Sequence, residues 1–225
     1  MKFVVFGGEQ RVGLLLGDRI VDLNRASARL PNRLLDLIEA GPSALDEVRR
    51  VADEFAGATP AKDSIVYSLN SVQLRAPWPG RRIACVGGNY AQHLLDMWAN
   101  RLGKTDITVE EVALEAKKAG QWGFWKVPAE VAGPNDEIPF PKRVTYFDYE
   151  GEVAIVIGKR GKNIPASKIN EYVWGVTLFH DWSIRDGGGT DRMVSYNLQK
   201  NFDGAVSMGP CIVVGETHQQ DVPVE

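Results

Sequence analysis

The sequence is poor in cysteine and has no long hydrophobic run. Of its 225 residues only Cys85 and Cys211 carry thiols, and each lies inside an apolar stretch. Such a pair is more typical of free, buried thiols in a reducing compartment than of a disulfide. No apolar run reaches the roughly 18 residues that a membrane helix needs, and the chain does not open with a signal-peptide pattern. The sequence therefore predicts a cytoplasmic protein without a membrane span.

A strong charge of one sign is also missing. The 26 basic and 29 acidic residues leave a net charge of −3 and a pI near 5.7. Basic residues are scattered and form only short pairs such as Arg49-Arg50 and Lys117-Lys118. A nucleic acid or an anionic membrane would need a basic patch, so neither is a predicted partner. The sequence has no internal repeat and no low-complexity segment.

The first 72 residues have the pattern of a small α/β domain. Short apolar runs over 2–6, 12–16 and 19–21 predict three strands, and Gly17-Asp18 predicts a hairpin between the last two. Two helices are expected after these strands.

Asn32 can cap the first of these helices and Ser43 can cap the second, with Gly41-Pro42 between them. The apolar residues of the second helix fall on one face. Beyond the helices, the stiff segment 76–80 contains two prolines and a glycine. It marks the boundary between the N-terminal domain, residues 1 to 72, and a second domain over 73–225.

The second domain carries more strand signals than helix signals. From Val144 onward the chain is rich in β-branched and aromatic residues with glycine punctuation. Thr108 and Glu111 form a capping box for one helix, and residues 165–172 predict a second, short one. The predicted fold class is therefore α+β and mostly β.

Two glutamates one residue apart, Glu150 and Glu152, precede an apolar run at 153–157 that predicts a buried strand. Because side chains alternate along a strand, both glutamates point the same way. Neighbouring carboxylates repel each other, and a divalent cation such as Mg²⁺, Mn²⁺ or Ca²⁺ makes such a pair favourable. The pair alone fits equally well a strand edge whose two acids face water.

Four separate blocks of the sequence resemble, in order and spacing, those of the fumarylacetoacetate hydrolase family. They cover roughly residues 70 to 215, and the N-terminal unit resembles the small leading domain of many members. In the last block the family pattern Gly-Lys-Ser-Phe-Asp is matched by Gln-Lys-Asn-Phe-Asp. The blocks are Ile83 to His93, Asp148 to Lys159, His180 to Asp186, and Gln199 to Asp203 with Gly209-Pro210 downstream.

The resemblance implies a small N-terminal α/β domain followed by a rolled, mixed β-sheet catalytic domain. It also implies a divalent cation, Mg²⁺ or Mn²⁺, held by Glu150, Glu152 and Asp181. Three carboxylates leave open positions on an octahedral ion for water and a chelating substrate. Without the resemblance, Asp181 would be interpreted as a strand-end acid satisfied by backbone amides.

The resemblance assigns the role of general base to His93. Imidazole accepts a proton near neutral pH, and an acidic partner fixes its tautomer. Many family members supply that partner as a glutamate three residues further on, where this chain has the shorter Asp96. Either the local helix lies closer, or Asp96 only caps and the pair is weak.

Two lysines also match the family. Lys200 maps to a catalytic lysine, and Lys126 maps to a substrate-binding lysine, because ammonium groups bind a carboxylate and stabilise a developing enolate. A solvated surface lysine is the alternative for each. The resemblance adds Asn89 and Tyr90 as substrate-binding residues. Arg185 belongs to the same set, with the alternative that it holds the carboxylates in place.

The implied reaction is hydrolysis of a carbon–carbon bond in a 1,3-diketo or acylpyruvate-type acid. Decarboxylation, isomerisation or lyase chemistry on a 2-oxo acid is the alternative within the family. Family members continue past the end of this sequence, so we expect a C-terminally shortened chain: a fragment, one chain of a cleaved enzyme, or a degenerate relative. A catalytically silent structural or regulatory partner is the alternative from another class. The family also implies a homodimer or a higher homo-oligomer.

Overall fold

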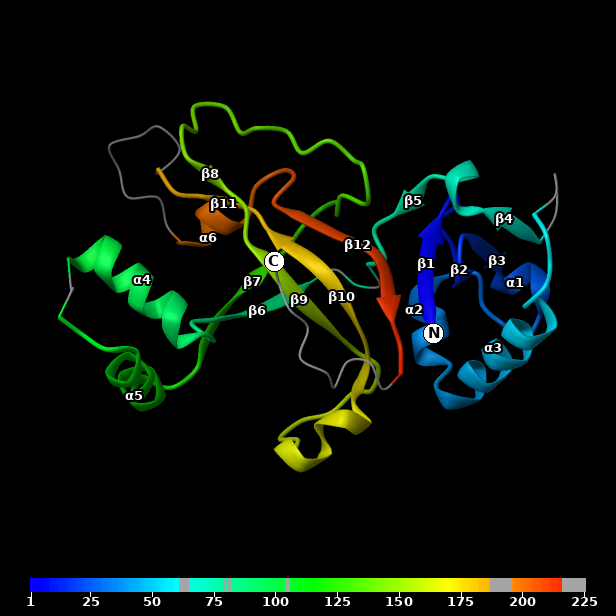
Figure 1. Cartoon of the computed structure of the whole chain (residues 1–225), viewed down its shortest axis with the longest axis horizontal. Helices are drawn as coiled ribbons and strands as arrows, with labels where there is room; N and C mark the ends of the chain where they lie inside the picture. The colour runs from blue at the N-terminus through cyan, green and yellow to red at the C-terminus, as the bar shows by residue number, and fades with distance from the viewer. Residues whose placement is uncertain (61–64, 79, 81, 104–105, 187–195, 216–225) are drawn as a thin grey trace.

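The computed structural model describes residues 1–60, 65–78, 80, 82–103, 106–186 and 196–215 (Figure 1). It is a strand-rich α+β fold, which confirms the predicted class. Within the described ranges, eight strands form one sheet in the order β4-β3-β2-β1-β12-β10-β9, with β5 paired to β1. Its strands are β1 (Lys2–Phe6), β2 (Arg11–Leu16), β3 (Arg19–Asp22), β4 (Val66–Ser68), β5 (Leu74–Arg75), β9 (Gly151–Ile157), β10 (Val173–Asp181) and β12 (Val206–Val213).

Two short strand pairs accompany this sheet. The first joins β6 (Ile83–Gly87) to β7 (Trp122–Lys126), and the second joins β8 (Phe147–Asp148) to β11 (Ser183–Ile184). All these strand pairs are antiparallel. Among the described residues, the parallel pairing of the expected mixed sheet occurs only as an isolated bridge between Ala132 and Ser207.

Figure 1 shows the helices around the strands. One group lies beside the N-terminal strands: α1 (Leu23–Ala26), α2 (Leu34–Glu39) and α3 (Pro42–Glu54). The others are α4 (Ala91–Leu102), α5 (Val109–Ala119) and α6 (Tyr196–Lys200), with 3₁₀ turns η1 (Leu69–Ser71) and η2 (Ala166–Glu171). The capping box of Thr108 and Glu111 begins α5 as predicted, whereas the short helix predicted over 165–172 is the 3₁₀ turn η2.

The N-terminal strands agree closely with the predictions. Leu16 pairs with Arg19 across the two-residue turn, so the predicted hairpin is confirmed. Gly17 takes a φ of +64° there, a left-handed conformation that costs glycine no steric penalty.

The predicted helix starts were wrong at both caps. Helix α2 has Arg33 at its N-cap without a side-chain bond, and the backbone carbonyl of Asn32 accepts a hydrogen bond from Val12 instead. Helix α3 starts at Pro42, one residue before Ser43. Proline suits the first helical position because its φ is already helical and its missing N–H would have no helical partner.

The main sheet passes through both predicted domains. Strand β1 pairs with β12 through Lys2 opposite Val213 and Phe3 opposite Ile212. The largest apolar cluster follows the same route, since it packs N-terminal residues such as Phe3 against Trp174. The boundary between residues 1–72 and 73–225 stays a prediction, and a shared sheet and core join the two sides.

The prediction that residues 153–157 form a buried strand was wrong for one of its faces. Val156 is buried and Ala154 half-buried, but Val153, Ile155 and Ile157 are exposed. In the described structure β9 lies at the end of the sheet, next to β10. Burial of this strand therefore depends on what covers its outer face, which a local pattern does not report.

Gly175 is expected to be intolerant of any side chain. A Cβ on this residue of β10 would lie 2.6 Å from the backbone oxygen of Val213 and 2.7 Å from Ile212 Cγ2. Gly175→Ala should therefore lower the free energy of unfolding by about 1–3 kcal/mol, as overpacked cores do. Urea denaturation measures this, with Gly8→Ala as control because no atom lies within 4 Å of its Cβ position. Equal stability of the two variants would contradict this packing.

Candidate active site

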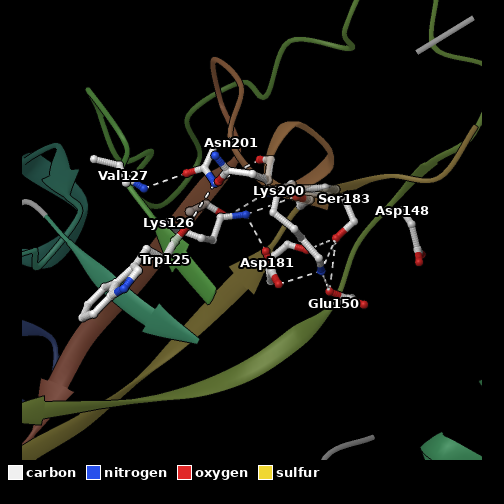
Figure 2. Close-up of polar contacts among 12 residues, drawn as sticks. Trp125, Lys126, Val127, Asp148, Glu150, Asp181, Ser183, Lys200 and Asn201 are labelled. Atoms are coloured by element: carbon white, nitrogen blue, oxygen red, sulfur yellow. Dashed lines mark hydrogen bonds and ion pairs between the residues drawn. The ribbon is translucent and has the colours of Figure 1, made fainter. Parts of the chain in front are cut away.

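The carboxylates of Glu150 and Asp181 lie together where β9 begins and β10 ends (Figure 2). The antiparallel pairing of these strands continues to this point, since the backbone N–H of Asp181 donates to the carbonyl of Glu150 at 2.9 Å. Asp181 is only 4% exposed. The end of the β9–β10 ladder therefore holds two carboxylates that are 31 positions apart in the sequence.

Two buried lysines neutralise these carboxylates. Lys126, the last residue of β7, donates to Asp181 Oδ1 and to the carbonyl of Trp182 at 3.2 Å. Lys200, the last residue of α6, donates to Asp181 Oδ2 at 2.7 Å and to Glu150 Oε2. Lys126 is 0% and Lys200 2% exposed, so the solvated-surface interpretation does not hold for either.

The pKa values reflect this mutual neutralisation. Burial outweighs the attraction of Asp181 and lowers the pKa of Lys126. Burial also opposes the charge of Lys200, but hydrogen bonds and charges from Asp181 and Glu150 outweigh it and raise that pKa. For Glu150, burial is likewise outweighed, here by Lys200 and Arg185, and the pKa falls to about 2. Lys200 and Glu150 thus stabilise each other's charged forms, whereas burial disfavours the charged form of Lys126.

Glu152 belongs to the same cluster electrostatically but has a different environment. It is an exposed residue of β9. Partial burial, then the negative charges of Glu150 and Asp181, raises its pKa, while Lys200 and His93 act in the opposite direction. The third carboxylate therefore lies close enough to the other two to be repelled by them.

These carboxylates fit a divalent cation by their chemistry. Hard oxygen ligands suit Mg²⁺ or Mn²⁺, and three carboxylates facing two ammonium groups retain negative charge. Within the described ranges, no three His, Cys, Asp or Glu side chains are gathered as a ready cation site. The ammonium group of Lys200 contacts both Glu150 and Asp181. A cation held by these two residues would take over the contacts that Lys200 makes to them.

His93 and Asp96 lie on α4 and are both exposed. The carboxylate of Asp96 accepts a hydrogen bond from Gln92 Nε2 at 3.0 Å. In the described part of the chain no hydrogen bond joins His93 to Asp96. The structure thus places His93 near Glu152 but does not form the predicted pair with Asp96.

The predicted substrate-binding residues separate into two groups. Asn89 and Tyr90 precede α4, where Asn89 Nδ2 donates to the carbonyl of Val86 at 2.9 Å and Tyr90 is 69% exposed. Neither contacts the carboxylate cluster by a described hydrogen bond. Arg185 donates to Asp148 at 2.9 Å and to Glu150, which supports the alternative that it holds the carboxylates in place.

The sequence interpretation missed Ser183 and Asn201. Ser183 is fully buried, and its hydroxyl accepts a hydrogen bond from Lys200 at 2.6 Å and lies 3.1 Å from Glu150 Oε2. Asn201 binds the backbone on both sides of Lys126. The signal for each was its position: Ser183 is two residues after Asp181, and Asn201 directly follows Lys200.

The described structure thus combines a strand-rich fold with a buried cluster of carboxylates and ammonium groups. The chain belongs to the fumarylacetoacetate hydrolase family, because residues 82–224 match the family model described as fumarylacetoacetate (FAA) hydrolase C-terminal. This confirms the resemblance seen in the sequence blocks. The chain is therefore a member of an enzyme family.

Oxaloacetate tautomerases are among the similar relatives. The mitochondrial oxaloacetate tautomerase fahd2 of Xenopus laevis is 31% identical over 206 residues, which are 90% of this chain and 57% of the relative. Oxaloacetate tautomerase YisK of Bacillus subtilis is 31% identical over 212 residues, covering 90% and 65%. The chain thus spans about three fifths of the length of these two relatives.

Solved structures share the fold. The maleylpyruvate hydrolase of Sphingobium sp. SYK-6, in complex with manganese(II) and pyruvate, matches 95% of this chain and 67% of its own with a TM-score of 0.65 and 20% identity. A putative HpcE protein from Mycobacterium smegmatis matches 95% and 66% with a TM-score of 0.66 and 26% identity. In the part of the chain that the structure describes, no helix has the length and hydropathy to cross a membrane.

Proposed function

We propose that this chain forms the active site of a divalent-metal-dependent enzyme that converts a small 2-oxo acid through its enolate. Tautomerisation of oxaloacetate is the first reaction to test, because relatives of that name are 31% identical to this chain. The observation that carries the proposal is the pair of buried ammonium groups on Asp181, beside Glu150 and Glu152. Such a cluster offers oxygen ligands to a cation and positive charge to an acid.

The side chains divide the work of this proposed reaction. A bound cation, Mg²⁺ or Mn²⁺, would be held by Glu150, Glu152 and Asp181 and would polarise a 2-oxo group as a Lewis acid. Lys126 and Lys200 direct ammonium groups to the same place, where they compensate negative charge that develops on a substrate oxygen. Their burial strengthens this effect because little water screens them.

Hydrolysis of an acylpyruvate-type carbon–carbon bond is the second candidate. It would use His93, which is exposed on α4 and lies close enough to Glu152 to influence the pKa of Glu152. An imidazole that is open to solvent beside an acidic cluster suits activation of a water molecule. The same position suits transfer of a proton to and from a substrate carbon, so the two candidates differ in substrate and not in residues.

Metal removal tests the proposal directly. Protein treated with EDTA should lose conversion of enol-oxaloacetate and recover it when Mn²⁺ or Mg²⁺ is added back. Ca²⁺ is the third ion to compare in the same assay. Loss of the enol absorbance reports tautomerisation, and the same assay with acylpyruvates reports hydrolysis. A protein that binds metal but turns over no 2-oxo acid would refute the enzymatic proposal. Metal analysis of the purified protein separates this case from a metal-free, catalytically silent partner.

His93 and Asp96 should differ strongly in importance. His93→Ala is expected to lower kcat by about 10²–10⁴-fold, the usual contribution of a general acid or base. Asp96→Asn should lower it by less than about tenfold, because Asp96 is bonded to Gln92 and not to His93. Steady-state kinetics on both variants measures this. Similar losses would mean that Asp96 turns toward His93 when substrate binds.

The cytoplasmic location and the homodimer belong to the proposal as well. Cys85 and Cys211 are both free, in keeping with a reducing compartment. Sedimentation of the purified chain tests the assembly.

A further inference from the structure

Asn201 joins the strand that carries Lys126 to the helix that ends at Lys200 (Figure 2). Its Oδ1 accepts a hydrogen bond from the backbone N–H of Val127 at 2.7 Å. Its Nδ2 donates to the backbone carbonyl of Trp125 at 3.0 Å. The side chain therefore forms hydrogen bonds with the backbone immediately before and immediately after Lys126.

The two bonds reproduce the contact that a neighbouring strand would make. Residues i−1 and i+1 of a strand direct their backbone groups to the same edge, so the carbonyl of Trp125 and the N–H of Val127 lie side by side. A carboxamide carries an acceptor and a donor in one plane, which matches this arrangement. A serine hydroxyl is shorter and cannot span both groups. Asn201 thus holds the backbone of β7 in a fixed position relative to the end of α6.

This position matters because the ammonium groups of both lysines contact one carboxylate. Lys126 donates to Oδ1 of Asp181 and Lys200 to Oδ2. A lysine side chain has a flexible stem of four carbons, so its ammonium group stays in place only when its backbone is held. Among the described residues, α6 spans Tyr196–Lys200 and packs against β7 and β11. The hydrogen bonds of Asn201 add to these contacts.

We propose that Asn201 is a positioning residue that sets the distance between the two ammonium groups over Asp181. It acts through the backbone of Lys126 and through its own place next to Lys200. Its consequence for catalysis rests on the proposed function, but its effect on the lysines does not.

The lysine ammonium groups themselves provide the first measurement. In ¹H–¹⁵N correlation spectra of the full chain, buried and hydrogen-bonded ammonium groups exchange slowly and give signals. Lys126→Arg and Lys200→Arg assign the two signals by removing them. Asn201→Ala should broaden or shift both signals, and Asn201→Ser should do so to a smaller extent because one hydrogen bond remains.

Asn197→Ala is the matched control. Asn197 is an exposed residue of α6, and its Oδ1 accepts a hydrogen bond from Asn201 Nδ2 at 2.8 Å. The control removes a bond to the same carboxamide but keeps both bonds to β7. It should leave the lysine signals unchanged.

Kinetics supplies the second measurement. Asn201→Ala should lower kcat about 10- to 100-fold with KM changed less than about threefold, because misplaced ammonium groups weaken stabilisation of the transition state. Asn197→Ala should retain kcat within about twofold.

The outcomes separate cleanly. Wild-type lysine signals in Asn201→Ala, or equal changes in Asn201→Ala and Asn197→Ala, would overturn the proposal. If Asn201→Ala does not fold, Asn201→Ser decides by the same signals. If the wild-type protein converts no 2-oxo acid, the proposed function fails, and the lysine signals still decide the role of Asn201.

Discussion

Replacing Glu152 with glutamine is expected to abolish turnover and to leave the protein as stable as before or slightly more stable. In the folded protein, burial and the charges of Glu150 and Asp181 raise the pKa of Glu152. A raised pKa means that the folded state disfavours the ionised carboxylate, so its charge costs stability at neutral pH and glutamine removes that cost. The gain should stay below about 1 kcal/mol because the residue is exposed.

The loss of activity should be at least about 10³-fold, since a proposed ligand of the cation disappears. Turnover at ordinary Mn²⁺ concentration and the thermal midpoint in EDTA measure the two effects separately. Lys159→Gln serves as control, because this exposed residue has its salt bridge with Glu171 and lies away from the cluster. An active Glu152→Gln protein would remove Glu152 from the proposed set of ligands.

Asp181→Asn should abolish activity and also destabilise the fold strongly. Asp181 accepts hydrogen bonds from Lys126 and Lys200, which are 0% and 2% exposed. Without the carboxylate, the buried ammonium group of Lys126 loses the charge that compensates it, and Lys200 keeps only its contact with Glu150. Breaking a buried pair from one side costs about 3–5 kcal/mol. Urea denaturation of the metal-free protein measures the loss.

Asp148→Asn is the control for this prediction. Asp148 pairs with Arg185 near the surface and is 30% exposed at its side chain, so its loss should cost less than about 1 kcal/mol. Asp181→Asn with wild-type stability would show that the lysines find other partners or lose their charge.

Local signals in the sequence predicted local structure well. The hairpin at Gly17-Asp18 and the capping box of Thr108 and Glu111 depend on residues within four positions, and both are confirmed. The cap at Ser43 was wrong because Pro42 competes for the first helical position. The outer face of β9 was also wrong, since its burial depends on parts of the protein that pack over the sheet.

The site was predictable only as a set of positions. The resemblance selected Lys126 and Asp181, which the fold brings into contact although 55 positions separate them. Spacing in the sequence could not show that Lys200 lies between two carboxylates, because that depends on how α6 packs against β7 and β11. The sequence also could not show which side chain forms a hydrogen bond with Asp96. Gln92 and His93 are adjacent in the sequence, and only the helix geometry decides which of them reaches Asp96.

The pairing of β1 with β12 bears on how relatives could exchange parts by recombination. A graft that swaps the N-terminal unit at the linker also swaps one of the two neighbours of β12, and β12 flanks the strand that ends in Asp181. Compatible chimeras must therefore keep Phe3 matched to Ile212 across the junction. A cut at the linker alone therefore separates two strands that are hydrogen-bonded to each other.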